Sequence, residues 1–291
     1  MQKILFFQSM WAMELRSALR PENSLEEKIN MIKAAGYDGI STDWRSSEDV
    51  RVIHGLLNDA GLVAEGQCFP KTIDELKPAL ENAAKYGVHH LEIQPDVRPR
   101  RMEECIPLIE GWSRLIEQVD FPVYIETHRD RMTTDLYFTL DLLDRFPDLK
   151  LLGDISHFVV GREFTLPITE ESDQQIKQIL NHCWAYHGRV ASREQVQIEL
   201  SYPQHEIWFN QFLTWWEYGF RSWRKKSKAG DSLAFTCELG PKPYAITGPD
   251  GEDTTDRWKE ALLLRERVKL AWDKSAVPEK TAAPSELKDG R

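Results

Sequence analysis

The feature that most constrains the fold is an alternation of strand-like and helix-like segments that repeats along almost the whole sequence. Short apolar runs are typical of buried strands, and longer amphipathic runs are typical of helices. The expected strands cover residues 3–8, 38–42, 62–67, 89–94, 122–128, 149–154, 183–190 and 233–240. The expected helices cover residues 24–35, 47–60, 72–86, 101–118, 134–145, 171–181, 205–222 and 256–273. Eight strands, each followed by a helix, predict an α/β protein of the (β/α)8 TIM-barrel class over residues 1–274.

A doubly wound open sheet is the rival architecture. Gly36, Gly61 and Gly87 each follow a helix-like segment, where a residue in the left-handed conformation ends a helix before the next strand. The first strand–helix turn, however, lacks the G-x-G-x-x-G sequence of a dinucleotide-binding half. The pattern therefore favours the closed barrel.

Two segments depart from the repeat. Residues 191–232 form a long insert whose aromatic side chains are interpreted either as core or subunit interface, or as a lid or sugar-stacking surface over the active site. These side chains are Tyr202, Trp208, Phe209, Phe212, Trp215, Trp216, Tyr218, Phe220 and Trp223. Residues 275–291 are rich in Pro, Ala and charged residues and lack periodicity, so we expect a flexible tail or an arm that contacts another subunit.

Charge and cysteine content narrow the class of protein. The formal net charge of -10 argues against a non-specific nucleic-acid binder, which needs clustered Lys and Arg to contact phosphates. No apolar stretch reaches the length of a membrane span, and the N-terminal apolar run is too short for a signal peptide. The four cysteines are scattered, as expected for reduced thiols. We predict a cytoplasmic protein that binds neither nucleic acid nor membranes, and we expect a homo-oligomer, either a dimer or a tetramer.

Four consecutive expected strands end in side chains that can bind a metal. Glu126, Asp154, His187 and Glu238 follow one another in this way, and in TIM barrels the chemistry lies at the carboxyl ends of the strands. Converging carboxylates repel one another and are costly to bury without a cation. Three carboxylates and one imidazole suit Mn²⁺, Mg²⁺, Co²⁺ or Zn²⁺. In the fourth strand Glu92 alternates with apolar neighbours, which makes it a candidate for the barrel interior as well.

As an ordered set these motifs resemble the xylose-isomerase-like TIM-barrel superfamily, in its sugar phosphate isomerase/epimerase group, over roughly residues 3–273. The motifs are a strand-ending Glu, an Asp-x-x-His, a His with an Arg six residues later, and a final Glu. The resemblance implies one divalent metal ion, with Mn²⁺ expected first. It assigns the metal to Glu126, Asp154, His187 and Glu238, proton transfer to Glu126 and Glu238, and substrate oxygens to His157 and Arg193.

The chain also departs from the ketose 3-epimerases of this group. They carry a second acidic residue where this sequence has Met132, and His128 and Arg129 stand beside Glu126 instead. We expect His128 and Arg129 to contact substrate. An added imidazole and cation suit an acidic or phosphorylated substrate, or the general acid of an elimination.

The function predicted from these residues is a metal-dependent isomerase or epimerase that abstracts a proton next to the carbonyl of a sugar or sugar derivative. A keto-sugar or inosose-type dehydratase on the same site is the first alternative. A non-catalytic sugar-binding barrel, with the aromatic insert as its platform, is the second. A nuclease with several metals would need more histidines at strand ends, and His89 and His90 lie early in their strand.

Overall fold

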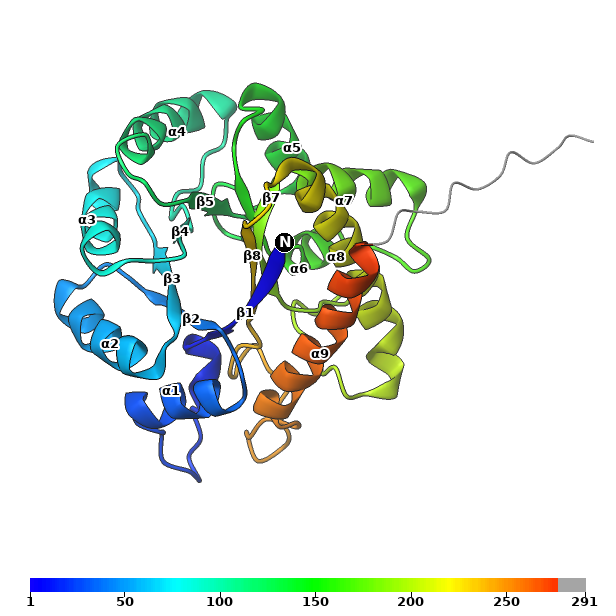
Figure 1. Cartoon of the computed structure of the whole chain (residues 1–291). Coiled ribbons are helices and arrows are strands. Elements are labelled where there is room, and N and C mark those ends of the chain that lie inside the picture. The colour runs from blue at the N-terminus through cyan, green and yellow to red at the C-terminus, as the bar shows by residue number, and fades with distance from the viewer. Residues whose placement is uncertain (277–291) are drawn as a thin grey trace, which may run out of the picture.

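The computed structural model describes residues 1–276 as a closed barrel of eight parallel strands, in which each strand pairs with its sequence neighbours and the first pairs with the last (Figure 1). The strands are β1 (Lys3–Ser9), β2 (Gly39–Asp43), β3 (Val63–Cys68), β4 (His90–Ile93), β5 (Val123–Glu126), β6 (Leu151–Gly153), β7 (Cys183–Gly188) and β8 (Ser232–Cys237). The predicted (β/α)8 barrel is confirmed.

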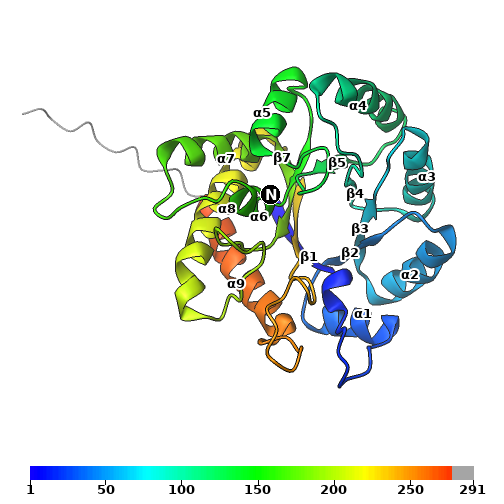
Figure 2. The ribbon, with the colours of Figure 1, turned by 180° about the vertical axis from the view of Figure 1, so that it is seen from behind.

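Helices surround the strands on the outside, as the two opposite views show (Figures 1 and 2). They are α1 (Leu25–Ala34), α2 (Ser47–Ala60), α3 (Lys77–Tyr86), α4 (Met102–Ile116), α5 (Leu136–Arg145), α6 (Ser156–Gly161), α7 (Glu170–His182), α8 (Glu206–Lys226) and α9 (Arg257–Ser275). There are also three short 3-10 helices, η1 (Trp11–Met13), η2 (Asp74–Leu76) and η3 (Pro203–His205). Gly36, Gly61 and Gly87 have the expected positive φ, with values of 77°, 69° and 78°. Gly61 is in the left-handed conformation, whereas a ψ of 142° places Gly87 outside it. Helix α6 was not expected, because its six residues are too few to show a helical period.

Alternation along the strands decides which side chains fill the barrel interior. Residues two apart on a strand face the same side. At one level the interior is apolar, with a cluster of Phe7, Tyr124, Leu152, Ala185 and Ala234. Two residues further along each strand, toward its carboxyl end, the buried side chains become polar or charged. The same periodicity that builds the apolar layer therefore aims the candidate site residues at one another.

The aromatic insert is part of the core. Its helix α8 packs between α7 and α9, and the ring of Trp216 meets Phe235 of β8 edge-on with centroids 5.1 Å apart. We call the buried side chains of this helix the aromatic shell; they are Phe209, Phe212, Trp215, Trp216, Phe220 and Trp223. Of the two interpretations of this stripe, the structure supports packing between helix and barrel over a lid.

The remaining regional expectations can be placed briefly. Helix α9 continues to Ser275, whose buried hydroxyl donates to the Trp272 carbonyl. The rest of the predicted tail, 277–291, lies outside the described residues. All four cysteines are free and buried. Between residues 1 and 276, no helix combines the length and apolarity needed to cross a membrane.

Candidate metal centre and active site

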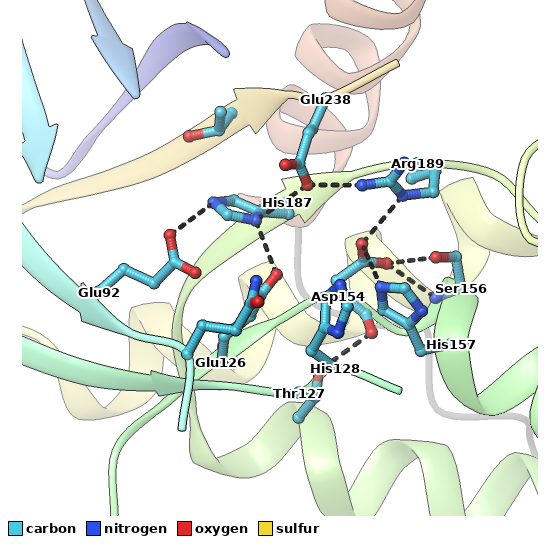
Figure 3. Close-up of polar contacts among 12 residues, drawn as sticks. Glu92, Glu126, Thr127, His128, Asp154, Ser156, His157, His187, Arg189 and Glu238 are labelled. Carbon is cyan, nitrogen blue, oxygen red and sulfur yellow. Dashed lines mark hydrogen bonds and ion pairs between the residues drawn. The ribbon is translucent and has the colours of Figure 1, made fainter. Parts of the chain in front are cut away.

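Three of the four predicted metal ligands meet in the barrel interior (Figure 3). The Nδ1 atom of His187 lies 3.0 Å from Glu126 Oε1 and 3.1 Å from Glu238 Oε2. One ligand atom from each of the three residues falls within 4.8 Å of the others. All three side chains are buried. The three side chains come from β5, from β7 and from the residue after β8. As the strand-end pattern predicts, residues up to more than a hundred positions apart in the sequence meet in the fold.

Two further glutamates lie on the opposite edge of the His187 ring. Its Nε2 atom is 2.8 Å from Glu65 Oε1 of β3 and 3.6 Å from Glu92 Oε2 of β4. Glu65, Glu92 and His187 form a second group whose ligand atoms lie within 4.8 Å. A carboxylate on the second ring nitrogen fixes the orientation and tautomer of a metal-binding histidine. Glu65 can do this while Nδ1 faces Glu126 and Glu238.

Glu65 also begins a polar chain that runs through the barrel toward the amino ends of the strands. Its Oε2 atom lies 2.8 Å from His90 Nε2 and accepts a hydrogen bond from the Thr236 hydroxyl at 3.1 Å. The two Nδ1 atoms of His89 and His90 are 2.9 Å apart, and His89 Nε2 is 2.8 Å from the Ser232 hydroxyl. His90 is therefore part of the buried network, although it stands early in its strand.

Asp154 is buried but does not join the three converging ligands. Its Oδ1 atom accepts hydrogen bonds from the Ser156 amide at 3.0 Å and the Ser156 hydroxyl at 2.5 Å. Its Oδ2 atom lies 3.2 Å from Arg189 Nε. Arg189 Nη2 in turn donates to Glu238 Oε2 at 2.8 Å, so the guanidinium stands between Asp154 and Glu238 (Figure 3).

His157 lies in the first turn of α6, and the expected loop at this position is wrong. It is fully buried, and neither ring nitrogen has a hydrogen-bond partner. Its Nε2 atom is 3.4 Å from Asp154 Oδ2, and its ring lies 4.0 Å from that of His128. Burial, with positive neighbours such as His128 and Arg189, holds the pKa of His157 well below its usual value. The imidazole is accordingly a neutral group beside the site.

The remaining predicted substrate contacts are placed differently. His128 lines a cavity at the carboxyl end of the barrel and has its Nδ1 atom 2.5 Å from the Arg129 carbonyl oxygen. Arg129 stacks on the ring of Tyr244, 5.0 Å from its centroid, and Tyr244 lines the same cavity. Arg193 is exposed and pairs with Glu163 at 3.2 Å, so the structure does not bring it to the cluster.

The cavity gives the cluster an opening. Its volume is about 570 Å³, and its lining includes Trp11, Gln94, Arg131, Arg189 and Glu238. Gln94 donates to Glu126 Oε2 at 2.6 Å and accepts from Arg131 Nε at 3.0 Å. The outer oxygen of Glu126 is thus held from the cavity side while its inner oxygen faces His187.

We call eight buried acidic, imidazole and guanidinium side chains that lie on the strands, or one residue beyond them, the charged lumen; they are Glu65, His90, Glu92, Glu126, Asp154, His187, Arg189 and Glu238. Five are carboxylates, and Arg189 is the single permanent cation among the eight. If all five carboxyls were ionised and both imidazoles protonated, five negative charges would face three positive ones. Net negative charge out of water is costly unless a cation neutralises it. The donor set therefore fits a divalent metal ion bound by oxygen and imidazole nitrogen.

The close approach of these buried charged groups shifts the pKa values of Glu126, Glu92 and His187. Burial would raise the pKa of Glu126, but the nearby imidazoles of His128 and His187 outweigh it and lower the pKa to about 2. Burial, and then the charge of Glu126, raises the pKa of Glu92 well above its usual range. Burial would lower the pKa of His187, yet the surrounding Glu238, Glu65 and Glu92 raise it well above the usual value. The surrounding carboxylates thus favour the protonated imidazole while no metal is bound, and a metal ion on Nδ1 would displace that proton.

Strand periodicity could have found the side chains that the strand-end argument missed. Glu65 lies within β3 at the level where β4 contributes His90. Arg189 lies two residues beyond His187, and Gln94 two beyond Glu92. Counting in steps of two from His187 and Glu92 identifies Arg189 and Gln94 as neighbours of the site, whereas Glu65 follows only from the pairing of β3 with β4.

Comparison with known proteins supports the fold. The sequence matches no protein-family model and no curated protein. Among solved structures it is similar to the probable 3-DHS dehydratase AsbF of Bacillus anthracis, with TM-score 0.58 and 13% identity over 92% of this chain and 98% of that one. It is similar to a xylose isomerase domain protein of Planctomyces limnophilus, with TM-score 0.57 and 10% identity over 94% and 98%. It is also similar to the 3-keto-D-glucoside 4-epimerase YcjR of E. coli, with TM-score 0.55 and 16% identity over 92% and 100%.

These matches define the class of fold. The chain is a TIM barrel with xylose-isomerase-like structural neighbours, as the ordered strand-end motifs predict. Within that fold it carries a buried Glu/His cluster whose ligand atoms lie close enough together to hold a metal ion.

Proposed function

We propose that this protein is a divalent-metal-dependent isomerase or epimerase that acts on a sugar or sugar derivative by removing a proton next to a carbonyl. The observation that carries the proposal is the charged lumen, where five buried carboxylates face one guanidinium and two imidazoles beside a cavity of about 570 Å³. Glu126, His187 and Glu238 are the side chains that would hold the ion, and Mn²⁺ is the ion to test first.

The bound ion would supply a Lewis acid that draws charge from the carbonyl and hydroxyl oxygens of the substrate. The protein residues do the rest. Glu126 and Glu238 flank His187 Nδ1 from β5 and from the end of β8, so one carboxylate can remove the proton and the other can return it. Glu65 holds the far nitrogen of His187, and Gln94 holds Glu126 from the cavity side.

Dehydration of a keto-sugar on the same site is the second candidate. It starts with the same proton abstraction and then needs a general acid for the departing hydroxyl. His128 lines the cavity and lies beside Glu126 in sequence, so it is the side chain that favours this outcome. The names of the matched structures include both a dehydratase and an epimerase, and the fold does not choose between the reactions.

A non-catalytic sugar-binding barrel has less support, because six of the nine aromatic side chains proposed as its platform are buried in the aromatic shell. The proposed partner is therefore a small sugar substrate. Assembly as a homo-oligomer, a cytoplasmic location and the absence of nucleic-acid or membrane partners remain predictions from the sequence.

Metal content and proton exchange test the proposal. After removal of metals with EDTA and addition of Mn²⁺, elemental analysis is expected to find one ion per chain. Incubation with a panel of ketoses, keto-sugars and sugar acids in D₂O should give deuterium next to a carbonyl, detected by NMR. The Glu238→Gln variant should bind Mn²⁺ weakly and lose at least about 100-fold in exchange rate, since it lacks both a ligand and a base.

A matched control comes from Glu199, a buried glutamate outside the charged lumen that accepts a hydrogen bond from the Ile246 amide. Glu199→Gln should bind Mn²⁺ and exchange protons as the wild type does. Absence of Mn²⁺ binding by the wild type, or full activity in Glu238→Gln, would contradict the proposal.

A further inference from the structure

Arg189 is the unusual member of the charged lumen. It is a buried guanidinium, 2% exposed, and it contacts one predicted metal ligand on each side. Its Nε atom lies 3.2 Å from Asp154 Oδ2 and its Nη2 atom 2.8 Å from Glu238 Oε2. The same Glu238 oxygen lies 3.1 Å from His187 Nδ1. The guanidinium therefore adjoins the place where Glu126, His187 and Glu238 converge, on the side where Asp154 stands.

The surroundings of Arg189 hold it in one orientation. Its guanidinium carbon lies 4.8 Å from the ring centroid of Tyr244 and 5.4 Å from that of Trp11. The indole of Trp11 packs so closely on Gly240 that a Cβ atom there would come within 2.1 Å of the ring. Gln197 accepts a hydrogen bond from Arg189 Nη1 at 3.3 Å. Two aromatic faces, a carboxamide and two carboxylates thus fix the plane of the guanidinium.

Arg189 also keeps donors for a ligand. A guanidinium has five N–H groups, and its hydrogen bonds to Asp154, Gln197 and Glu238 use three of them. The remaining two are on the two terminal nitrogens, and Arg189 lines the cavity of about 570 Å³. Where two N–H groups of a guanidinium point the same way, they bind two adjacent oxygens of an anion well.

Asp154, in contrast, has little coordinating capacity left. Both of its oxygens are engaged, Oδ1 by two donors of Ser156 and Oδ2 by Arg189. To become a fourth metal ligand Asp154 would have to share Oδ2 with, or take it from, a buried guanidinium whose one other carboxylate partner among residues 1–276 is Glu238. Breaking a buried pair in this way is strongly unfavourable.

We propose that Arg189 is a substrate-binding residue that holds oxygens of the reacting group beside the metal ion, and that Asp154 is the positioning residue that anchors Arg189 rather than a metal ligand. This inference rests on the proposed function. It makes the metal site a three-residue one, with positions open for substrate, as is common in catalytic metal sites. The guanidinium then stabilises negative charge that develops on substrate oxygens during proton abstraction.

Metal affinity separates Asp154 from the ligands. Titration calorimetry of Mn²⁺ into EDTA-treated protein should give Asp154→Asn an affinity within about 3-fold of wild type. Glu126→Gln, which removes one converging ligand, should lose at least about 100-fold under the same conditions. Asp154→Asn losing as much as Glu126→Gln would overturn this inference and leave the proposed function in place. A wild type that binds no Mn²⁺ would overturn the proposed function and this inference with it.

Binding of oxalate to the Mn²⁺-loaded protein tests Arg189. Oxalate presents two adjacent anionic oxygens, as an enediolate does. Arg189→Lys keeps the charge but loses the paired donors, and it should weaken oxalate binding at least about 10-fold while Mn²⁺ affinity stays within about 3-fold. Asp154→Asn should weaken oxalate binding by a similar factor, and Asp154→Glu, which restores the carboxylate, should recover part of it.

Equal oxalate affinity in wild type, Arg189→Lys and Asp154→Asn would overturn the proposal. Circular dichroism and thermal unfolding establish that each variant is folded. If Asp154→Asn does not fold, Asp154→Glu and Arg189→Lys still decide the question, because the oxalate and Mn²⁺ affinities of each are predicted separately. A purely structural Arg189 would leave the ratio of the two affinities unchanged.

Discussion

Two regions of the molecule are equally hidden from water and chemically opposite. The aromatic shell fills the space between α8 and the strands with large apolar side chains, whereas the charged lumen fills the carboxyl end of the barrel with ionisable ones. Burial of apolar surface stabilises a fold by about 25 cal/mol per Å². Burial of charge costs free energy unless every group finds a partner. The difference indicates that the aromatic shell stabilises the fold, whereas the charged lumen serves the chemistry of the site.

Within the charged lumen, the buried carboxylates differ in how many polar partners they have. Glu65 has three polar partners, His187, His90 and Thr236. Both oxygens of the equally buried Glu92 lack a hydrogen-bond partner. In the shell, by comparison, Trp216 has close ring contacts with Phe212 and Phe235. The two regions should therefore respond in opposite ways to mutation and to metal.

The largest expected effect on stability lies in the shell. Trp216→Ala removes a fully buried indole and should lower the free energy of unfolding by about 3–5 kcal/mol. Trp208 lies two turns earlier on α8 and is only partly buried, so Trp208→Ala should cost clearly less. Urea denaturation of the EDTA-treated proteins measures both. Mn²⁺ affinity should be unchanged in both variants. A variant of the aromatic shell that no longer binds Mn²⁺ would contradict the separate roles of the shell and the charged lumen.

Local sequence signals were sufficient for the fold. Apolar runs and amphipathic periods each report on a few neighbouring residues, and they recur with the eight strands of the barrel. The glycines at 36, 61 and 87 add three helix ends. Helix α6 was not predicted because its six residues are too few to show a helical period, and it begins two residues after Asp154. The tested part of the fold was therefore predictable from the pattern, apart from elements too short to show one.

The site was predictable only as far as strand ends determine position. Glu126, His187 and Glu238 converge because each lies at or next to the carboxyl end of its strand. The partner of Asp154 depends on how far the Arg189 side chain reaches between two strand ends, and no sequence spacing encodes that. Arg193 fits the spacing of the family motif, yet its loop carries it to Glu163 at the surface. Its role in substrate binding stays a prediction.

The second prediction uses the metal ion itself. Mn²⁺ at 100 times its dissociation constant should raise the free energy of unfolding by about 2.7 kcal/mol, because it binds the folded chain alone. Trp216→Ala should gain the same increment, since the shell and the lumen are separate. His187→Ala, which removes the nitrogen shared by both groups of candidate ligands, should gain none. An equal gain in His187→Ala would show that the ion binds elsewhere and would break the comparison.

The smallest expected effect compares two glutamates inside the lumen. Glu65→Gln replaces one carboxylate oxygen, which accepts hydrogen bonds, by an NH₂ group, which donates them. One of the donors on His90, His187 or Thr236 then loses its acceptor inside the barrel. The metal-free variant should lose about 2 kcal/mol in free energy of unfolding. Among residues 1–276 Glu92 has no hydrogen bond of normal geometry and only a long ion pair with His187 at 3.6 Å, so Glu92→Gln should change the stability of the metal-free protein by less than about 1 kcal/mol. Urea denaturation in EDTA measures the pair. Equal losses would show that partners do not decide which buried carboxylates the fold depends on, because the two side chains are equally buried on adjacent strands.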